Sequence, residues 1–165
     1  WRTLPSMVGL EDAREVADEY AKRTGSHWFE PDLLERDAYW VARVGFVGSM
    51  GVVIDKADGR VTVLGSAYSL ADWLWGYEHG LLEVDGTLRV LAVHDEEETV
   101  ELLSAVGVGG PPRSRNPWPR RTWVREQLSE LPADFPWQGE LGLLTPSFQT
   151  AAAERWFDFE VIRSA

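Results

Sequence analysis

Residues 51–80, GVVIDKADGRVTVLGSAYSLADWLWGYEHG, decide the fold class of this chain. The run GVVID is apolar enough for a buried strand, Asp58-Gly59 is a typical turn dipeptide, and the run after it alternates apolar and polar residues. The next segment carries apolar residues at helical spacing and ends at Gly80. The stretch therefore predicts a strand, a tight turn, a second strand and a helix that packs on the sheet.

The segments before this stretch add a helix and a third strand. Residues 10–23 place apolar side chains on one stripe, with acidic residues in the first turn and basic residues in the last, so they predict an amphipathic helix that Gly25 ends. Residues 26–37 predict a loop with a short helical turn at 31–36. Residues 38–47, AYWVARVGFV, predict a strand that is joined to GVVID by a short glycine-bearing loop. Three adjacent antiparallel strands are the expected result.

The segments after this stretch alternate between strand, helix and irregular patterns. Residues 87–93 predict a fourth strand, and Asp95 can cap a helix that ends at Gly107. Residues 107–119, GVGGPPRSRNPWP, predict an irregular loop rich in Gly, Pro and Arg. Three further elements are expected beyond this loop: a helix over residues 120–131, a helix that starts at Thr145-Pro146 and an edge strand over residues 157–162.

In chain order these elements predict an α+β fold, α-β-β-β-α-β-α, followed by a helical and irregular C-terminal extension and a terminal strand. We expect an antiparallel sheet of four to five strands with helices packed on it. The length of 165 residues suits a single domain over residues 1–165. Within it, residues 8–106 form the expected core and residues 107–165 the extension.

Composition and charge narrow the classes of function. The net charge of −11 argues against general binding to nucleic acid or to an anionic membrane, and it suits a partner with a basic face. The absence of Cys excludes disulfides, zinc–thiolate sites and thiol nucleophiles within this sequence. No apolar run approaches the roughly 18 residues that a membrane span needs. We therefore expect a cytoplasmic protein.

No motif for catalysis, metal binding or cofactor binding is evident. Ser49 lies beside Gly48, but strands are expected on both sides of it, whereas a nucleophile elbow joins a strand to a helix. The residues from His94 to Glu98 fan around a helix axis and do not converge on one ion. We therefore expect no enzymatic activity, no cofactor and no metal site. An unrecognised hydrolase built around His94 and Glu97 stays as an alternative.

The segment from residue 111 to residue 125 is the basic feature of the sequence, with Trp118 and Trp123 among its arginines. This mixture is typical of phosphate and base contacts, of protein–protein contacts and of intramolecular straps. Residues 1–111 carry 9 basic and 20 acidic groups, whereas residues 112–165 carry 7 of each. The imbalance favours a strap whose arginines pair with the acidic body, with contact to a protein or to nucleic acid as alternatives.

Three segments carry a resemblance to a known family: the helix LEDAREVADEYAKR, the aromatic strand YWVARVGFV and the strand–turn–strand VVIDKADGRVTVLGS. Over residues 8–82 the chain resembles the YrhB-like immunity-protein family of bacterial polymorphic-toxin systems. The resemblance implies an antitoxin without enzymatic activity that binds a cognate protein toxin and blocks its active site or its activation. Such a toxin could be a nuclease or an NAD-consuming enzyme, whose basic cleft an acidic inhibitor can occupy.

Charge and expected exposure, and no family motif, select the candidate contact residues for such a partner. They are Trp75, Asp95, Glu96, Glu97, Glu98, Arg115 and Trp118. The alternative is a nucleic-acid-binding or nucleotide-binding module that uses the loop around Arg115 and Trp118.

Overall fold

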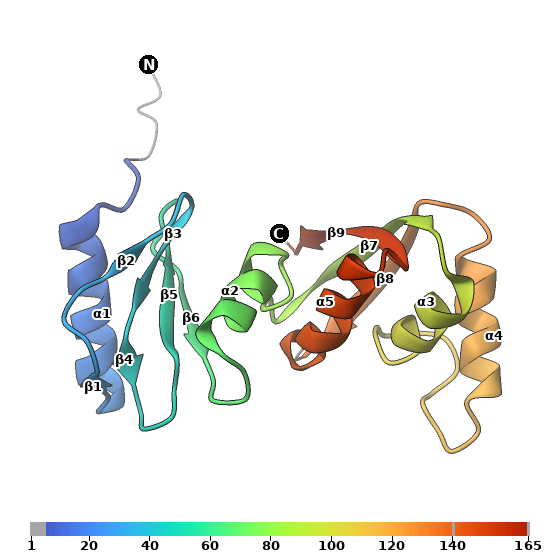
Figure 1. Cartoon of the computed structure of the whole chain (residues 1–165), viewed down its shortest axis with the longest axis horizontal. Coiled ribbons are helices and arrows are strands. Elements are labelled where there is room, and N and C mark those ends of the chain that lie inside the picture. The colour runs from blue at the N-terminus through green and yellow to red at the C-terminus, as the bar shows by residue number, and fades with distance from the viewer. Residues whose placement is uncertain (1–5, 140, 165) are drawn as a thin grey trace. The chain divides into compact units, whose positions relative to one another are not determined.

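The computed structural model describes residues 6–139 and 141–164, and it divides into two compact units, Trp1–Leu70 and Ala71–Ala165. Both units combine helices with antiparallel strands (Figure 1), which confirms the expected α+β class. The boundary at Leu70 falls inside the expected core over residues 8–106. The segment expected as an extension, residues 107–165, belongs to the second unit together with residues 71–106.

The described residues of the first unit form one complete helix and six strands. These are α1 (Leu10–Thr24), β1 (His27–Trp28), β2 (Leu34–Glu35), β3 (Tyr39–Ala42), β4 (Val44–Gly45), β5 (Gly51–Asp55) and β6 (Val61–Leu64). The strands β2, β3, β5 and β6 form an antiparallel sheet in that order, and β1 pairs with β4. The three expected adjacent strands are thus confirmed. The expected helical turn at residues 31–36 is wrong, because Leu34 and Glu35 are extended and pair with β3.

Helix α1 packs its apolar stripe on the strands of this unit (Figure 1). The buried cluster between them comprises Ala13, Ala17, Tyr20 and Ala21 of α1 and Trp40, Ala42, Val44, Val52 and Ile54 of the strands. The small alanines let the helix approach the strands closely, and the strand residues supply the volume. The helix ends at Gly25, which has a φ of 70° and whose N–H donates to the oxygen of Ala21.

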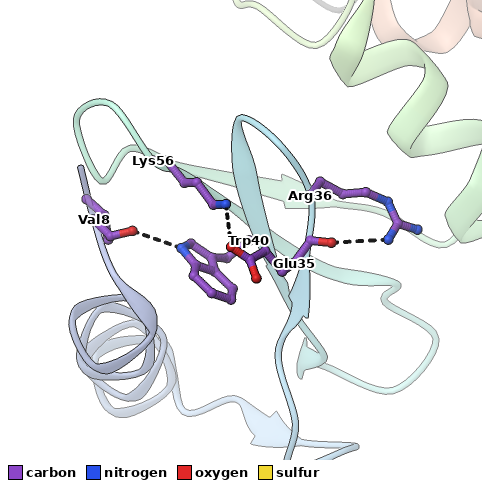
Figure 2. Close-up of polar contacts among 5 residues, drawn as sticks. All are labelled: Val8, Glu35, Arg36, Trp40 and Lys56. Atoms are coloured by element: carbon purple, nitrogen blue, oxygen red, sulfur yellow. Dashed lines mark hydrogen bonds and ion pairs between the residues drawn. The ribbon is translucent and has the colours of Figure 1, made fainter.

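A lysine is buried in the first unit between an indole ring and a carboxylate. Only 8% of Lys56 is exposed, and its Nζ lies 2.7 Å from an oxygen of Glu35 and 4.8 Å from the centre of the Trp40 ring. The indole N–H of Trp40 donates to the main-chain oxygen of Val8 at 2.9 Å, as Figure 2 shows. The ring is therefore fixed, and the cation gains both an ion pair and a cation–π contact.

The second unit contains helices and one further sheet. Its elements are α2 (Leu70–Glu78, whose first residue lies at the boundary), β7 (Asp85–Val93), α3 (Glu96–Leu103), α4 (Trp118–Gln127), β8 (Ala133–Gln138), the 3-10 helix η1 (Leu141–Leu144), α5 (Thr145–Ala153) and β9 (Phe157–Arg163). The sheet is antiparallel with the order β8-β7-β9. The edge position of the last strand is confirmed.

The first unit contains an antiparallel sheet of four strands, but the predicted strands do not all belong to it. The fourth predicted strand, β7, does not join β3, β5 and β6 but forms the centre of the second sheet. Its partner β8 lies between the helix expected over residues 120–131 and the helix expected at Thr145-Pro146, where the sequence pattern predicts no strand. Pro136 is tolerated because β8 is an edge strand, where a missing N–H can be accommodated.

One buried cluster joins all the layers of the second unit. It includes Leu88 and Val90 of β7, Val100 and Leu103 of α3, Val124 of α4, Phe135 and Trp137 of β8, Phe148 of α5 and Phe157 of β9. Trp73 of α2 is also buried. Since α3, α4 and α5 each place side chains in this cluster, their outer faces are held in fixed positions.

Candidate functional site

The N-terminus of α3 is fixed by a side-chain cap and by the residue that precedes β9. Asp95 Oδ1 accepts from the N–H of Glu98 at 3.1 Å, which confirms the predicted cap. The N–H groups of His94 and Asp95 donate to the main-chain oxygen of Trp156 at 2.8 and 3.0 Å. The carboxylate of Asp95 is therefore used inside the unit, and three glutamates follow it in the first turn.

The glutamates of α3 differ in their partners. Glu101 pairs with Arg121, and Glu96 lies 3.7 Å from Arg125, so α4 compensates these two carboxylates. Within residues 6–139 and 141–164, no ion pair is formed by the carboxylates of Glu97 and Glu98. The inner face of the helix is buried, with Val100 and Leu103 in the core, so the two uncompensated charges point outward.

A groove of about 390 Å³ lies between α3 and α4. Its lining consists of Glu97, Glu98, Val100, Glu101, Trp118, Arg121 and Arg125. The Trp118 side chain is 62% exposed, and the guanidinium carbon of Arg121 lies 5.8 Å from the centre of its ring. The groove thus brings together three residues that the sequence suggested separately, Glu97, Glu98 and Trp118. It combines an exposed indole with two carboxylates that form no ion pair among the described residues.

The loop between α3 and α4 is organised by Arg120, of which only 5% is exposed. Its guanidinium donates to the main-chain oxygens of Ser104, Val106, Gly107, Gly109 and Pro111, with distances from 2.7 to 3.4 Å. Burial, together with the nearby charge of Arg113, lowers the pKa of Arg120 below its ordinary value. The carbonyl dipoles stabilise the buried cation in place of a carboxylate.

The contacts of the other arginines in this segment test the predicted intramolecular strap. Arg121 and Arg125 pair with glutamates of α3, so the predicted strap is confirmed for these two residues. Arg113 donates to the main-chain oxygen of Ala105 at 2.8 Å, and this contact and those of Arg120 are to the backbone and not to acidic side chains. Arg115 is exposed and forms no hydrogen bond or ion pair within the described part of the chain.

Four of the predicted contact residues do not line this groove: Trp75, Asp95, Glu96 and Arg115. Trp75 stacks on His79, with 4.0 Å between the ring centres, and packs against the core of the second unit. It is half-buried, so its predicted exposure is only partial. Arg115 is not among the residues that line the groove between α3 and α4.

A second groove, of about 410 Å³, lies on the other side of α3, next to α5. Figure 1 shows α3 between α4 and α5. The groove is lined by Glu98, Glu101, Leu102, Ala105, Leu144, Pro146, Ser147, Thr150 and Trp156. Sequence reasoning missed Glu101 and Trp156. The spacing of Glu101, three residues after Glu98, places both on one helix face and could have identified it, whereas no local signal marks Trp156.

The polar groups suspected of chemistry have structural partners. Ser49 Oγ donates to the oxygen of Leu64 at 2.9 Å and accepts from the N–H of Gly51 at 3.1 Å, so it closes the turn before β5. His94 Nε2 lies 3.0 Å from a carboxylate oxygen of Asp158. Among residues 6–139 and 141–164, no group of three His, Cys, Asp or Glu side chains could hold a metal ion. None of the helices described is long and apolar enough to cross a membrane.

No protein-family model, curated protein or solved structure matches this chain. The grooves on either side of α3 are the candidate binding surfaces of the second unit.

Proposed function

We propose that this protein is an immunity protein that binds and neutralises a cognate protein toxin through the acidic outer face of α3. The observation that carries the proposal is the groove between α3 and α4, where Glu97 and Glu98 form no ion pair with any described residue and lie beside the exposed Trp118. The family resemblance of residues 8–82 supports the choice of a toxin as the partner.

The charge distribution supports a partner with a basic surface. Residues 71–165 carry 8 basic and 16 acidic groups, a balance of −8, whereas residues 1–70 carry 8 and 11, a balance of −3. Complementary charges accelerate encounter and disfavour wrong partners. An exposed Trp among charged groups is the kind of residue that anchors a protein interface. A nuclease or an NAD-consuming enzyme would offer the basic cleft with which it holds its anionic substrate.

The alternative of a nucleic-acid-binding module receives less support from the arginines. Arg113, Arg120, Arg121 and Arg125 contact backbone oxygens or glutamates of their own unit. A phosphate backbone would have to displace these contacts and approach the uncompensated glutamates of α3. The hydrolase alternative also lacks a specific observation, since His94 pairs with Asp158 and not with a nucleophile.

The test is co-expression of this chain with the product of the adjacent gene in its host genome, followed by growth assays and co-purification. We expect restored growth and a stable complex. The double variant Glu97→Gln/Glu98→Gln should weaken the complex about tenfold and reduce its dependence on salt, since two surface charges are lost. The control variant Glu126→Gln/Glu130→Gln makes the same charge change on exposed residues outside the groove. Failure to relieve toxicity or to co-purify would refute the proposal.

A further inference from the structure

The groove between α3 and α5 combines carboxylates and an indole but no cation. Glu98 and Glu101 line one side, and Leu102 and Pro146 are among the apolar residues that line the rest. None of its lining residues is Lys, Arg or His. The carboxylate of Glu101 already pairs with Arg121, whereas that of Glu98 has no ion pair among the described residues.

The half-buried Trp156 lines this groove and is held in place by several contacts. Its main-chain oxygen accepts from the N–H groups of His94 and Asp95, and its indole N–H donates to Glu154 at 3.1 Å. Since the N–H is occupied, the π-face is the part of the ring left for a ligand.

At two other sites in this chain, an indole and a carboxylate are joined by a cationic side chain. In the first unit, Lys56 lies between the Trp40 ring and the carboxylate of Glu35 (Figure 2). In the second unit, Arg121 pairs with Glu101 and lies 5.8 Å from the centre of the Trp118 ring. At both sites a cationic side chain contacts an indole and a carboxylate together. The groove that contains Trp156 and Glu98 has the same two components without the cation.

We infer that this groove receives an arginine side chain from the protein partner. The inference rests on the proposed function and names the chemistry by which that partner is recognised. The guanidinium would pair with Glu98 and stack on Trp156, while its methylene stem would lie on Leu102 and Pro146.

The shape and polar groups of the groove favour arginine over lysine. A planar guanidinium has five N–H donors, whereas an ammonium has three and is more strongly hydrated. The hydroxyl oxygens of Ser147 and Thr150 lie in the same lining as the two glutamates. Thr150 Oγ1 donates to the oxygen of Pro146, so its lone pairs can accept from a guanidinium N–H. The groove therefore offers acceptors beyond one carboxylate, and the five donors of arginine can use more of them than the three of lysine.

The experiment uses the full chain and three small probes: N-acetyl-arginine amide, its lysine counterpart and the neutral isostere N-acetyl-citrulline amide. Binding is followed in two-dimensional NMR spectra through the indole N–H resonance of Trp156, which is assigned by its loss in Trp156→Phe. We expect a saturable shift with the arginine probe, a weaker response to the lysine probe and none to the citrulline probe. Glu98→Gln should weaken arginine binding about fivefold, because one exposed ion pair is lost.

The control is Glu130→Gln, an exposed carboxylate of the same unit that does not line the groove. It should leave the shift unchanged. An equal response to arginine and citrulline, an equal response to arginine and lysine, or unchanged binding in Glu98→Gln would overturn the inference. These outcomes differ from a failure of the proposed function, which would appear as the absence of a complex in co-expression while the arginine probe still binds.

Discussion

The guanidinium of Arg120 donates to the main-chain oxygen of Val106 across 2.7 Å, at a position where the side chain is almost completely buried. The same group also reaches oxygens of Gly109 and Pro111. One side chain of α4 therefore holds the turn after α3 and the beginning of the following loop. Because both grooves include α3, the loop and its anchor determine how the acidic face is presented.

Replacement of Arg120 by Ala should lower the free energy of unfolding of the second unit by roughly 2–4 kcal/mol, because several buried carbonyl oxygens lose a charged donor. Arg120→Lys should recover only part of this loss, since an ammonium cannot reproduce the planar fork. Urea denaturation measures both effects. The control Arg115→Ala, at an exposed position, should change stability by less than about 0.5 kcal/mol. Equal midpoints for Arg120→Ala and Arg115→Ala would contradict the anchoring role.

The two adjacent glycines of this loop should differ in their tolerance of a side chain. Gly109 and Gly110 have φ values of 88° and 67°, so Ala is strained at both. A Cβ at Gly109 meets nothing within 4 Å, whereas one at Gly110 would overlap the ring of Trp123. We expect Gly109→Ala to cost about 1 kcal/mol and Gly110→Ala roughly 2–3 kcal/mol. Thermal unfolding of the two variants measures the difference, and similar melting temperatures would show that Trp123 can move aside.

The residue after the C-cap of α5 is a site where a substitution should stabilise the protein. Arg155 has a φ of 56°, in the left-handed region that favours glycine. Arg155→Gly should therefore raise the free energy of unfolding by about 1 kcal/mol. The matched variant is Gly25→Ala at the end of α1, where φ is 70° and a Cβ would meet nothing within 4 Å. It should lower stability by about the same amount. Changes of equal sign in the two variants would contradict this explanation.

The ion pair between β7 and β8 should make stability depend on pH in the acid range. Arg89 Nε donates to Asp134 Oδ1 at 2.8 Å, and this hydrogen bond holds the pKa of Asp134 below its ordinary value of 3.8. A lowered folded-state pKa contributes stability above the unfolded-state value, and that contribution is lost as the pH falls through the folded-state value. Asp134→Asn should therefore be less stable than the parent chain at pH 7.

The deficit of Asp134→Asn should shrink as the pH falls below 3.8. Chemical denaturation at several pH values checks this trend. Asp85→Asn serves as the control, because Asp85 is an exposed residue of β7 that forms no ion pair within the described part of the chain. A deficit of the same size at pH 7 and at about pH 2.5, well below the ordinary pKa of an aspartate, would show that the asparagine acts through packing.

Local patterns in the sequence predicted where helices, strands and turns lie better than they predicted which strands pair with one another. The Asp58-Gly59 turn, the Asp95 cap and the helix start at Thr145 depend on neighbouring residues, and the structure confirms all three. The assignment of β7 to a second sheet depends on contacts with β8 and β9, far along the chain. A strand pattern gives the faces of a strand but not its neighbours, so strands expected side by side lie in separate sheets.

The strand β8 and the anchoring role of Arg120 escape prediction from the sequence for two different reasons. In β8, Ala133, Phe135 and Trp137 are buried at every second position, so a period-two signal was present although Pro136 obscured it. Arg120 has no such signal, because nothing in its neighbourhood distinguishes it from Arg121 or Arg115. Its role is visible only in the folded chain, where its guanidinium donates to main-chain oxygens that follow α3.

Because most arginines of the segment from residue 107 to residue 127 contact their own unit, a fragment of this segment would behave differently from the intact chain. A synthetic peptide of residues 107–127 would carry five arginines and one glutamate, and it would behave as a polycation that adsorbs to nucleic acid and to anionic surfaces. In the intact chain four of these arginines contact backbone oxygens or glutamates of the same unit. Truncation would therefore expose cationic groups that in the intact chain contact backbone oxygens and glutamates of the same unit.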